Sequence, residues 1–287
     1  MAFSYTTYKQ FNEDIARWLP HVPAISAVAG VPRSGILAAF MVAQLRHIPQ
    51  IPIESLMGSN PSYRPSVSRN LFKVNGPVLL IDDTCNRGRT KKEIKPLITH
   101  PNVLYGAVYA SDKAVDEGHV DVAGYKINTP HHAFEWNLLR DGITQHIMTD
   151  MDGVLCPDWH RPFDHGEYQA EYENWLDNVP VMRLPTKPVR AIVTARLEKY
   201  REKTERWLAK HHIKYDHLVM HQGDDPTKRN AVKHKVAAFK KYANQTNVFI
   251  ESDPGQALAI AKATNWAVLC FKTGELHNPT LMTPRWK

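Results

Sequence analysis

The chain has 287 residues, a formal net charge of +7 at pH 7 and an isoelectric point near 9.2. This length predicts two domains, and the basic balance favours anionic partners, phosphorylated sugars as readily as nucleic acid. The sequence has no signal segment and no apolar run long enough to span a bilayer, so we expect a cytoplasmic protein without membrane contact. Three widely spaced cysteines without a CxxC pair argue against a zinc knuckle.

The first predicted elements are a helix, a strand and a second helix. Apolar side chains recur at helical spacing over residues 5–19, which predicts an amphipathic helix. A strand over residues 24–29 and a helix over residues 36–45 follow, joined by the turn GVPRSG. Glycines let a backbone approach an anion closely, and a helix start adds its positive end. The candidate phosphate-binding residues of this turn are Gly30, Arg33, Ser34 and Gly35.

A second loop of this kind follows the apolar strand predicted over residues 78–81. Asp82 and Asp83 stand at the carboxyl end of that strand, and a helix is predicted over residues 89–98. Backbone N–H groups at such a turn form a nest for a phosphate, with the carboxylates beside it for ribose hydroxyls or a metal. The candidate phosphate-binding residues here are Thr84, Cys85, Asn86, Arg87, Gly88, Arg89 and Thr90.

The run VLLIDDTCNRGRT resembles the phosphoribosyl-pyrophosphate (PRPP) motif of type I phosphoribosyltransferases, and GVPRSG looks like the pyrophosphate loop of the same family. The resemblance implies that Asp82 and Asp83 act on the ribose hydroxyls and that Mg²⁺ arrives with PRPP. It also implies a flexible loop at residues 59–73, where Arg64 and Arg69 would assist the leaving pyrophosphate; an ordinary solvated loop is the alternative. Arg87 departs from the family, which more often has a small hydroxyl residue there.

A strand is predicted over residues 103–110, and no acceptor for the ribosyl group can be read from the residues after it.

The second half of the chain repeats the alternation of strands and helices. Predicted strands over residues 146–149, 189–193 and 248–250 are each followed by polar side chains, and a helix is predicted over residues 227–243. Asp150 and Asp152, one residue apart at a strand end, are placed for attack on phosphorus and for proton transfer. The other candidates are Thr194, Lys235, Glu251 and Asp253.

These residues resemble, in order, the four motifs of the haloacid dehalogenase (HAD) phosphohydrolases. The resemblance implies that Asp150 is the nucleophile, Asp152 the acid and base, and Thr194 and Lys235 the phosphate-binding residues. It implies a Mg²⁺ site made by Asp150, Asp152 and either Glu251 or Asp253; the spacing Glu-Ser-Asp, where many members have two adjacent Asp, leaves open which.

An insertion between residues 156 and 187, with a helix over residues 167–178, resembles a small cap. Its His160 and His165, together with Asp158 and Asp164, also hint at a metal cluster.

The sequence therefore predicts an α/β protein with two open parallel-sheet Rossmann-like domains, a phosphoribosyltransferase-like domain at 1–141 and a HAD-like domain at 142–287. The first hypothesis is a bifunctional enzyme that transfers 5-phosphoribosyl from PRPP to an unidentified acceptor and then removes the 5-phosphate. The alternatives are an independent salvage transferase and phosphatase, or a PRPP- or nucleotide-sensing module joined to a phosphatase that acts on nucleic-acid ends. A phosphomonoester substrate is expected, nucleic acid is the less favoured partner, and a homo-oligomer is compatible with the sequence.

Overall fold

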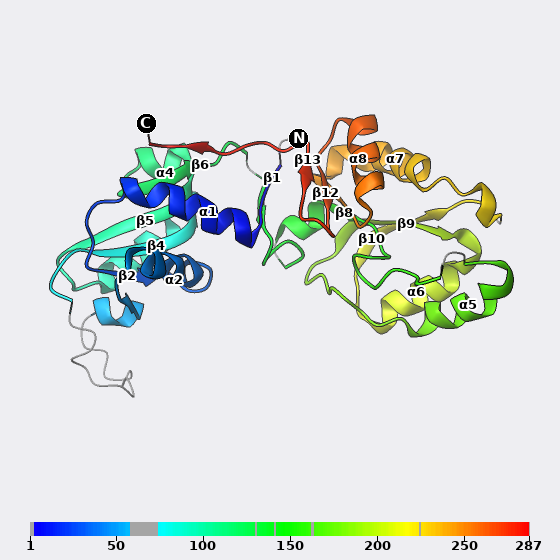
Figure 1. The fold of residues 1–287 in the computed structure, drawn as a ribbon, viewed down its shortest axis with the longest axis horizontal. Coiled ribbons are helices and arrows are strands. Elements are labelled where there is room, and N and C mark those ends of the chain that lie inside the picture. Colours follow the sequence, from blue (N-terminus) through cyan, green and yellow to red (C-terminus); the bar gives the residue numbers. More distant parts are fainter. Residues whose placement is uncertain are drawn as a thin grey trace. The chain divides into compact units, whose positions relative to one another are not determined.

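The computed structural model describes residues 3–57, 74–129, 131–140, 142–161, 164–223 and 225–286. It contains two six-stranded sheets that are parallel except at one edge strand each, which confirms the expected α/β class (Figure 1). The expected loop residues Arg64 and Arg69 lie outside the described residues. No described helix combines the length and apolar character that a membrane span requires.

The first compact unit comprises Tyr8–Asn128 and Leu281–Lys287. Its strand order is β14-β6-β5-β4-β2-β3. The strands are β2 (Ala27–Gly30), β3 (Gln50–Ile51), β4 (Val78–Cys85), β5 (Val103–Ala110), β6 (Val122–Lys126) and β14 (Thr283–Pro284). The helices are α1 (Tyr8–Trp18), α2 (Gly35–Arg46), α3 (Arg89–Ile94) and α4 (Asp112–Asp116).

Strand β4 is longer and helix α3 is shorter than the sequence predicts. The first four residues of β4 are buried, as expected for a central strand of a parallel sheet. Pairing with β5 then continues through Asp82 to Cys85, so both acids belong to the strand and do not follow it. Helix α3 ends at Ile94 because Pro96 has no N–H and restricts the residue before it.

The second compact unit comprises Met1–Thr7 and Thr129–Thr280. Its strand order is β10-β9-β8-β11-β12-β13, and a separate two-stranded sheet joins β1 to β7. The strands are β1 (Ser4–Thr6), β7 (His132–Phe134), β8 (Ile147–Thr149), β9 (Val189–Leu197), β10 (Tyr215–His221), β11 (Val248–Glu251), β12 (Val268–Cys270) and β13 (Leu276–His277). The helices are α5 (Gln169–Asn178), α6 (Arg201–Lys210), α7 (Ala231–Tyr242) and α8 (Pro254–Thr264).

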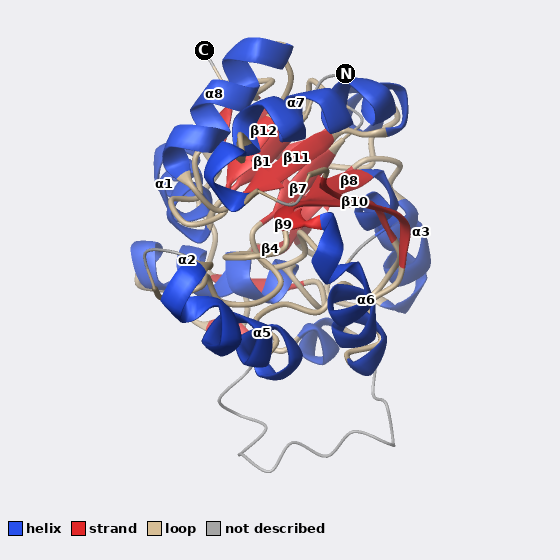
Figure 2. Cartoon of the chain, turned by 90° about the vertical axis from the view of Figure 1, so that its right-hand side faces the viewer, coloured by secondary structure: helices blue, strands red, loops and turns tan. Residues whose placement is uncertain are grey.

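Helices cover both faces of the large sheet of the second unit. Figure 2 shows α7 and α8 on one side of the strands and α6 on the other. On the first side Phe239 of α7 and Ile260 of α8 pack against Phe249 of β11. On the second side Trp207 and Leu208 of α6 join the larger core cluster. The sheet is therefore buried on both faces. The carboxyl ends of its parallel strands are where polar side chains can lie.

The two ends of the chain are exchanged between the units. The sequence predicted one helix from residue 5, but Ser4–Thr6 is strand β1, which pairs with His132–Phe134 of β7. At the other end, Thr283 and Pro284 pair with β6 of the first unit. The units thus differ from the expected domains 1–141 and 142–287 in three segments, 1–7, 129–141 and 281–287. Local periodicity cannot reveal such pairings, because the partner strands are far apart in sequence.

Candidate functional site

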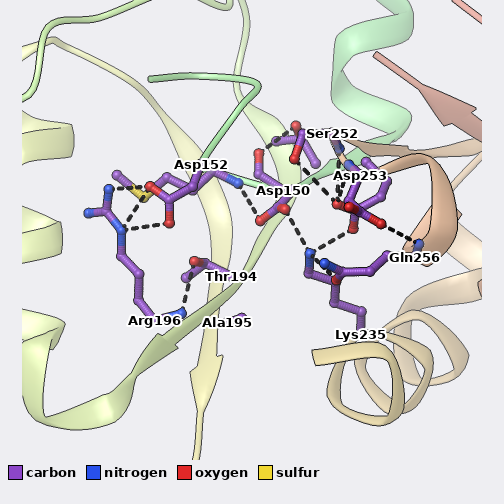
Figure 3. Close-up of polar contacts among 12 residues, drawn as sticks. Asp150, Asp152, Thr194, Ala195, Arg196, Lys235, Ser252, Asp253 and Gln256 are labelled. Atoms are coloured by element: carbon purple, nitrogen blue, oxygen red, sulfur yellow. Dashed lines mark hydrogen bonds and ion pairs between the residues drawn. The ribbon is translucent and has the colours of Figure 1, made fainter. Parts of the chain in front are cut away.

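The polar residues expected in the second half meet at one edge of its sheet. Asp150 directly follows β8, Thr194 lies in β9 and Glu251 ends β11. Strands β9, β8 and β11 are adjacent and parallel, so their carboxyl ends lie together. Helix α7 adds Lys235, and Asp253 stands at the start of α8. Figure 3 shows the resulting cluster of side chains.

Lys235 is the centre of this cluster. Its Nζ lies 2.7 Å from Asp150 Oδ2, 2.6 Å from Glu251 Oε2 and 3.1 Å from Gln256 Oε1 (Figure 3). The lysine is 2% exposed. Burial opposes its charge, but Asp150 and Glu251 together raise the pKa of Lys235 above its ordinary value. Burial also raises the pKa of Asp150 well above the usual range, and Lys235 opposes that rise only in part.

The two acids after β11 have different surroundings. Glu251 is fully buried, and its Oε1 accepts hydrogen bonds from the backbone N–H groups of Ser252 (2.9 Å) and Asp253 (3.1 Å). Its other oxygen contacts Lys235. Asp253 caps α8 by accepting the N–H of Gln256 at 2.7 Å. Asp253 lines the cavity of the site, so of the two acids it is the one open to a ligand.

Arg196 is a site residue that the sequence analysis missed. Its Nε and Nη2 donate to the Asp152 carboxylate at 3.0 and 2.6 Å, and it is 1% exposed. Burial opposes the charge of Arg196, but Asp152 raises its pKa. Arg196 N–H also donates to Thr194 Oγ1 at 3.1 Å. Residues two apart on a strand face the same side, so an Arg two positions after the expected Thr was a readable signal.

The cluster opens on a cavity of about 580 Å³. Its acidic lining includes Asp150, Asp152, Asp158 and Asp253. Aromatic side chains also reach it, from Trp159 and Tyr172. Its cations are Arg196, Arg229, Lys235 and Lys272. A cavity of this size has room for a small organic molecule.

The hinted metal cluster in the insertion is not formed. Asp164 pairs with Arg229 Nη2 at 2.6 Å, and His160 Nε2 lies 3.2 Å from Glu171. Among the residues that the structure describes, no group of three or more His, Cys, Asp or Glu side chains is arranged to hold a metal ion.

In the first unit the two expected loops meet at Asp82 and Asp83. Asp82 Oδ1 accepts the Asp83 N–H at 2.9 Å, and Ser34 hydrogen-bonds to the Asp83 carboxyl. Burial and the neighbouring Asp83 raise the pKa of Asp82 to about 8, and burial raises that of Asp83. The backbone at Gly35 approaches closely, since a Cβ there would lie 2.5 Å from the Ile81 carbonyl oxygen. Ser34 and the two acids therefore form one site.

The loop after β4 leaves most of its side chains open to solvent. Gly88 precedes α3 with φ +62°, and a Cβ there would lie 2.0 Å from the His119 ring. A side chain at this position would be both strained and obstructed. Of the expected phosphate-binding residues of the two loops, Arg33, Asn86, Arg87 and Arg89 are exposed. Ser34, Thr84, Cys85 and Thr90 are half-buried, and Gly30, Gly35 and Gly88 are buried.

Comparison with models of known protein families gives no match. No curated protein sequence matches either. Among solved structures, the chain is similar to a purine phosphoribosyltransferase from Pyrococcus horikoshii Ot3, with a TM-score of 0.35, 17% identity and coverage of 47% of this chain and 94% of that one. It is also similar to the Helicobacter pylori xanthine-guanine-hypoxanthine phosphoribosyltransferase, with a TM-score of 0.34, 15% identity and coverage of 46% of this chain and 93% of that one. A chain of the Pnkp1/Rnl/Hen1 complex aligns over 94% of this chain and 97% of its own length, at a TM-score of 0.32 and 14% identity. Likeness at this level says nothing of the site side chains.

Proposed function

We propose that the second unit is a phosphomonoester hydrolase in which Asp150 attacks phosphorus and forms an aspartyl-phosphate. The observation that carries this proposal is the buried contact of Lys235 with Asp150 at the floor of a cavity. A carboxylate fixed by an ammonium group is oriented for in-line attack, and the same ammonium group offsets charge on the phosphoryl oxygens. Thr194, on the adjacent strand, is fully buried and is not among the residues that line the cavity, so its hydroxyl would reach those oxygens only after a local movement.

Asp152 is the proposed proton donor to the leaving group and the proton acceptor from water. Both of its oxygens contact Arg196 in the structure. Proton transfer by Asp152 therefore requires that its carboxyl group turn away from the guanidinium and towards the substrate.

A divalent cation fits the charge balance of this site. The carboxylates in or against the cavity are Asp150, Asp152, Asp158, Asp164, Glu251 and Asp253. Counted in their ionised forms, these six carboxylates outnumber the four cations described above by two, so a dianionic phosphate would meet an excess of negative charge. Mg²⁺ would be held by Asp150, Asp253 and the main-chain oxygen of Asp152, and would supply positive charge at the phosphoryl oxygens. Glu251 would position Lys235.

For the first unit we propose transfer of 5-phosphoribosyl from PRPP to an acceptor. The meeting of Ser34 with Asp82 and Asp83 supports it, because the pyrophosphate and ribose ends of PRPP need adjacent sites. The two acids would hold the ribose hydroxyls, residues 84–90 the 5-phosphate, and Gly30, Arg33, Ser34 and Gly35 the pyrophosphate. Acting in sequence, the units would deliver an unphosphorylated ribosyl group to the acceptor.

Substitution of Asp150 by Asn tests the hydrolase. The change keeps size and removes the nucleophile, so release of inorganic phosphate from a panel of phosphomonoesters should fall by about 10³-fold or more. EDTA should stop release by the unmodified protein. Glu202→Gln, on the surface of α6, is the matched control and should keep full activity. Equal activity of the Asp150→Asn and control proteins would exclude Asp150 as nucleophile.

The same variant tests whether the units act in sequence. With PRPP and a panel of nucleobase acceptors, Asp150→Asn should still release pyrophosphate and accumulate a product that keeps its 5-phosphate, seen by mass spectrometry. A dephosphorylated product from this variant would separate the two activities. Absence of pyrophosphate release with every acceptor, while PRPP still binds, would favour a sensing module.

A further inference from the structure

Three of the four cations in the cavity, Arg196, Arg229 and Lys235, are paired with acids. Lys235 lies between the carboxylates of Asp150 and Glu251. Arg196 donates from two nitrogens to Asp152. Lys235 has three N–H donors, and its contacts with Asp150, Glu251 and Gln256 engage all three. Arg196 is 1% exposed and its remaining Nη1 is buried, so neither group presents donors to the open part of the cavity.

Arg229 is placed differently. It directly precedes Asn230, the residue that caps the N-terminus of α7. Helix α7 and the residue before its cap therefore contribute both Lys235 and Arg229 to the cavity lining. Arg229 Nη2 donates to Asp164 Oδ1 at 2.6 Å, and Nη1 donates to the carbonyl oxygen of Ala195 at 3.3 Å. The second contact brings the guanidinium beside the residue that follows Thr194.

The guanidinium of Arg229 is held by two contacts and still has N–H donors that no described group engages. A guanidinium has about five N–H donors, and the contacts with Asp164 and Ala195 engage one on each terminal nitrogen. The Asp164 side chain is 8% exposed and that of Arg229 is 21% exposed. A buried acid thus anchors a cation that reaches the open space of the cavity. Lys272 also lines the cavity, but it is exposed on a flexible stem.

We propose that Arg229 binds the phosphate group of the substrate in this cavity and that Asp164 is its positioning residue. This inference rests on the proposed hydrolase function and adds to it a residue and a role for the insertion. The remaining N–H donors of Arg229 would meet two phosphate oxygens, the paired geometry for which a planar guanidinium is suited and an ammonium is not. Asp164 comes from the insertion, so the insertion helps to build the phosphate site.

Kinetics of phosphomonoester hydrolysis test the proposal. Arg229→Gln should raise KM by about 10- to 100-fold and change kcat less, because a charge-assisted contact with the substrate is lost. Arg229→Lys should restore part of the loss, since charge returns without the paired donors. Asp164→Asn keeps shape but loosens Arg229, and should raise KM by about 3- to 10-fold.

Arg190→Gln is the matched control. Arg190 lies in β9 and pairs with Asp216 at 2.5 Å on the surface, away from the cavity, so this variant loses an Arg–Asp ion pair of the same unit and should keep an unchanged KM. If Arg229→Gln and Asp164→Asn melt like the control and keep the KM of the unmodified protein, Arg229 is only a tie between the insertion and the sheet, and the proposal is overturned.

Binding of tungstate, a phosphate analogue, separates failure of this inference from failure of the proposed function. Calorimetry with Mg²⁺ present measures this binding directly and does not require the protein to hydrolyse a substrate. The unmodified protein can fail to hydrolyse every phosphomonoester in the panel and still bind tungstate. In that case the anion site is supported if Arg229→Gln weakens tungstate binding by about tenfold or more and Arg190→Gln leaves it unchanged. Equal binding by both variants, or no binding by the unmodified protein, would overturn it.

Discussion

Lys235 is a charged residue whose burial depends on the acids around it. Its ammonium group is buried between Asp150 and Glu251, and Gln256 completes its contacts. The free energy of burying the two carboxylates depends on that one positive charge. The lysine therefore has a structural role whatever reaction the site performs.

Lys235→Met should destabilise the second unit by about 3–5 kcal/mol, because it leaves two buried carboxylates without their cation. Lys240→Met, on the exposed side of the same helix, should change stability by less than about 0.5 kcal/mol. Urea unfolding followed by tryptophan fluorescence gives both values. Similar stabilities of the two variants would mean that the Lys235 contacts contribute nothing to folding.

His132 is a residue whose burial makes stability depend on pH. Its Nδ1 lies 2.9 Å from Ser4 Oγ, its Nε2 is buried, and burial lowers its pKa to about 3. In the unfolded chain a histidine titrates near pH 6.5, about its ordinary value. The unfolded state therefore binds a proton between these two pKa values and the folded state does not, so stability is complete above pH ~6.5 and is lost as the pH falls towards 3.

From pH 7 to pH 5 the second unit should lose about 2 kcal/mol through His132. Urea unfolding at both pH values measures the loss. The same experiment on His132→Gln removes the titrating group and should show a loss smaller by about that amount. An identical pH dependence in the two proteins would assign the acid sensitivity to other groups.

Among the elements, the turn between β4 and α3 depends on one backbone conformation. Gly88 has φ +62° and lies against His119, so both its conformation and its lack of a side chain are required. Gly118 has a similar φ of +66°, but no atom lies within 4 Å of a Cβ built there. Comparing substitutions at Gly118 and Gly88 therefore separates two costs: backbone strain, which both positions share, and steric obstruction, which only Gly88 of these two has.

Gly118→Ala should cost about 1 kcal/mol of stability, the strain of an alanine at positive φ. Gly88→Ala should cost about 2–4 kcal/mol, since the same strain is joined by displacement of His119. It should also weaken PRPP binding, which Gly118→Ala should leave unchanged. Calorimetry on both variants measures stability and binding together, and equal effects would rule out the His119 contact as the cause.

At the scale of the whole molecule, each unit contains a strand from the far end of the chain. In the first unit, Arg285 Nη2 donates to the Ala110 carbonyl oxygen and to Asp112, each at 2.9 Å. Trp286 stacks on His21, with ring centres 5.0 Å apart, and meets Tyr125 edge-on at 4.8 Å. The last residues of the chain therefore help to hold the edge of the first sheet.

A chain that ends at Thr280 should lose about 1–3 kcal/mol of stability in the first unit and almost none in the second. Hydrogen exchange measured by mass spectrometry gives the two units separately. Exchange in β6 should become faster, while β11 should stay protected as in the full chain. Uniform acceleration in both strands would show that the terminal segment stabilises the protein as a whole.

The sequence by itself determined the alternation of strands and helices, and with it the α/β class. It also placed Asp150 at a strand end and Lys235 on a helix, because apolar periodicity and the polar residues that interrupt it are local properties. Thr194 was expected after a strand over residues 189–193 and instead lies within β9, which continues to Leu197. Gly88 was also predicted in a turn, but the contact with His119 that leaves no room for a side chain there joins residues far apart in the chain.

Only the tertiary structure decided which distant groups meet. The Arg196–Asp152 and Arg229–Asp164 pairs, the burial of Glu251 beneath Lys235 and the pairing of β1 with β7 join residues far apart in the chain. Sequence spacing can place a cation such as Arg196 on the face of a strand, but it does not show which acid the cation meets, because a charged side chain has the same pattern whether water or a partner surrounds it. Burial and charge pairing depend on the packed fold, and they decided which of the candidate residues face the cavity.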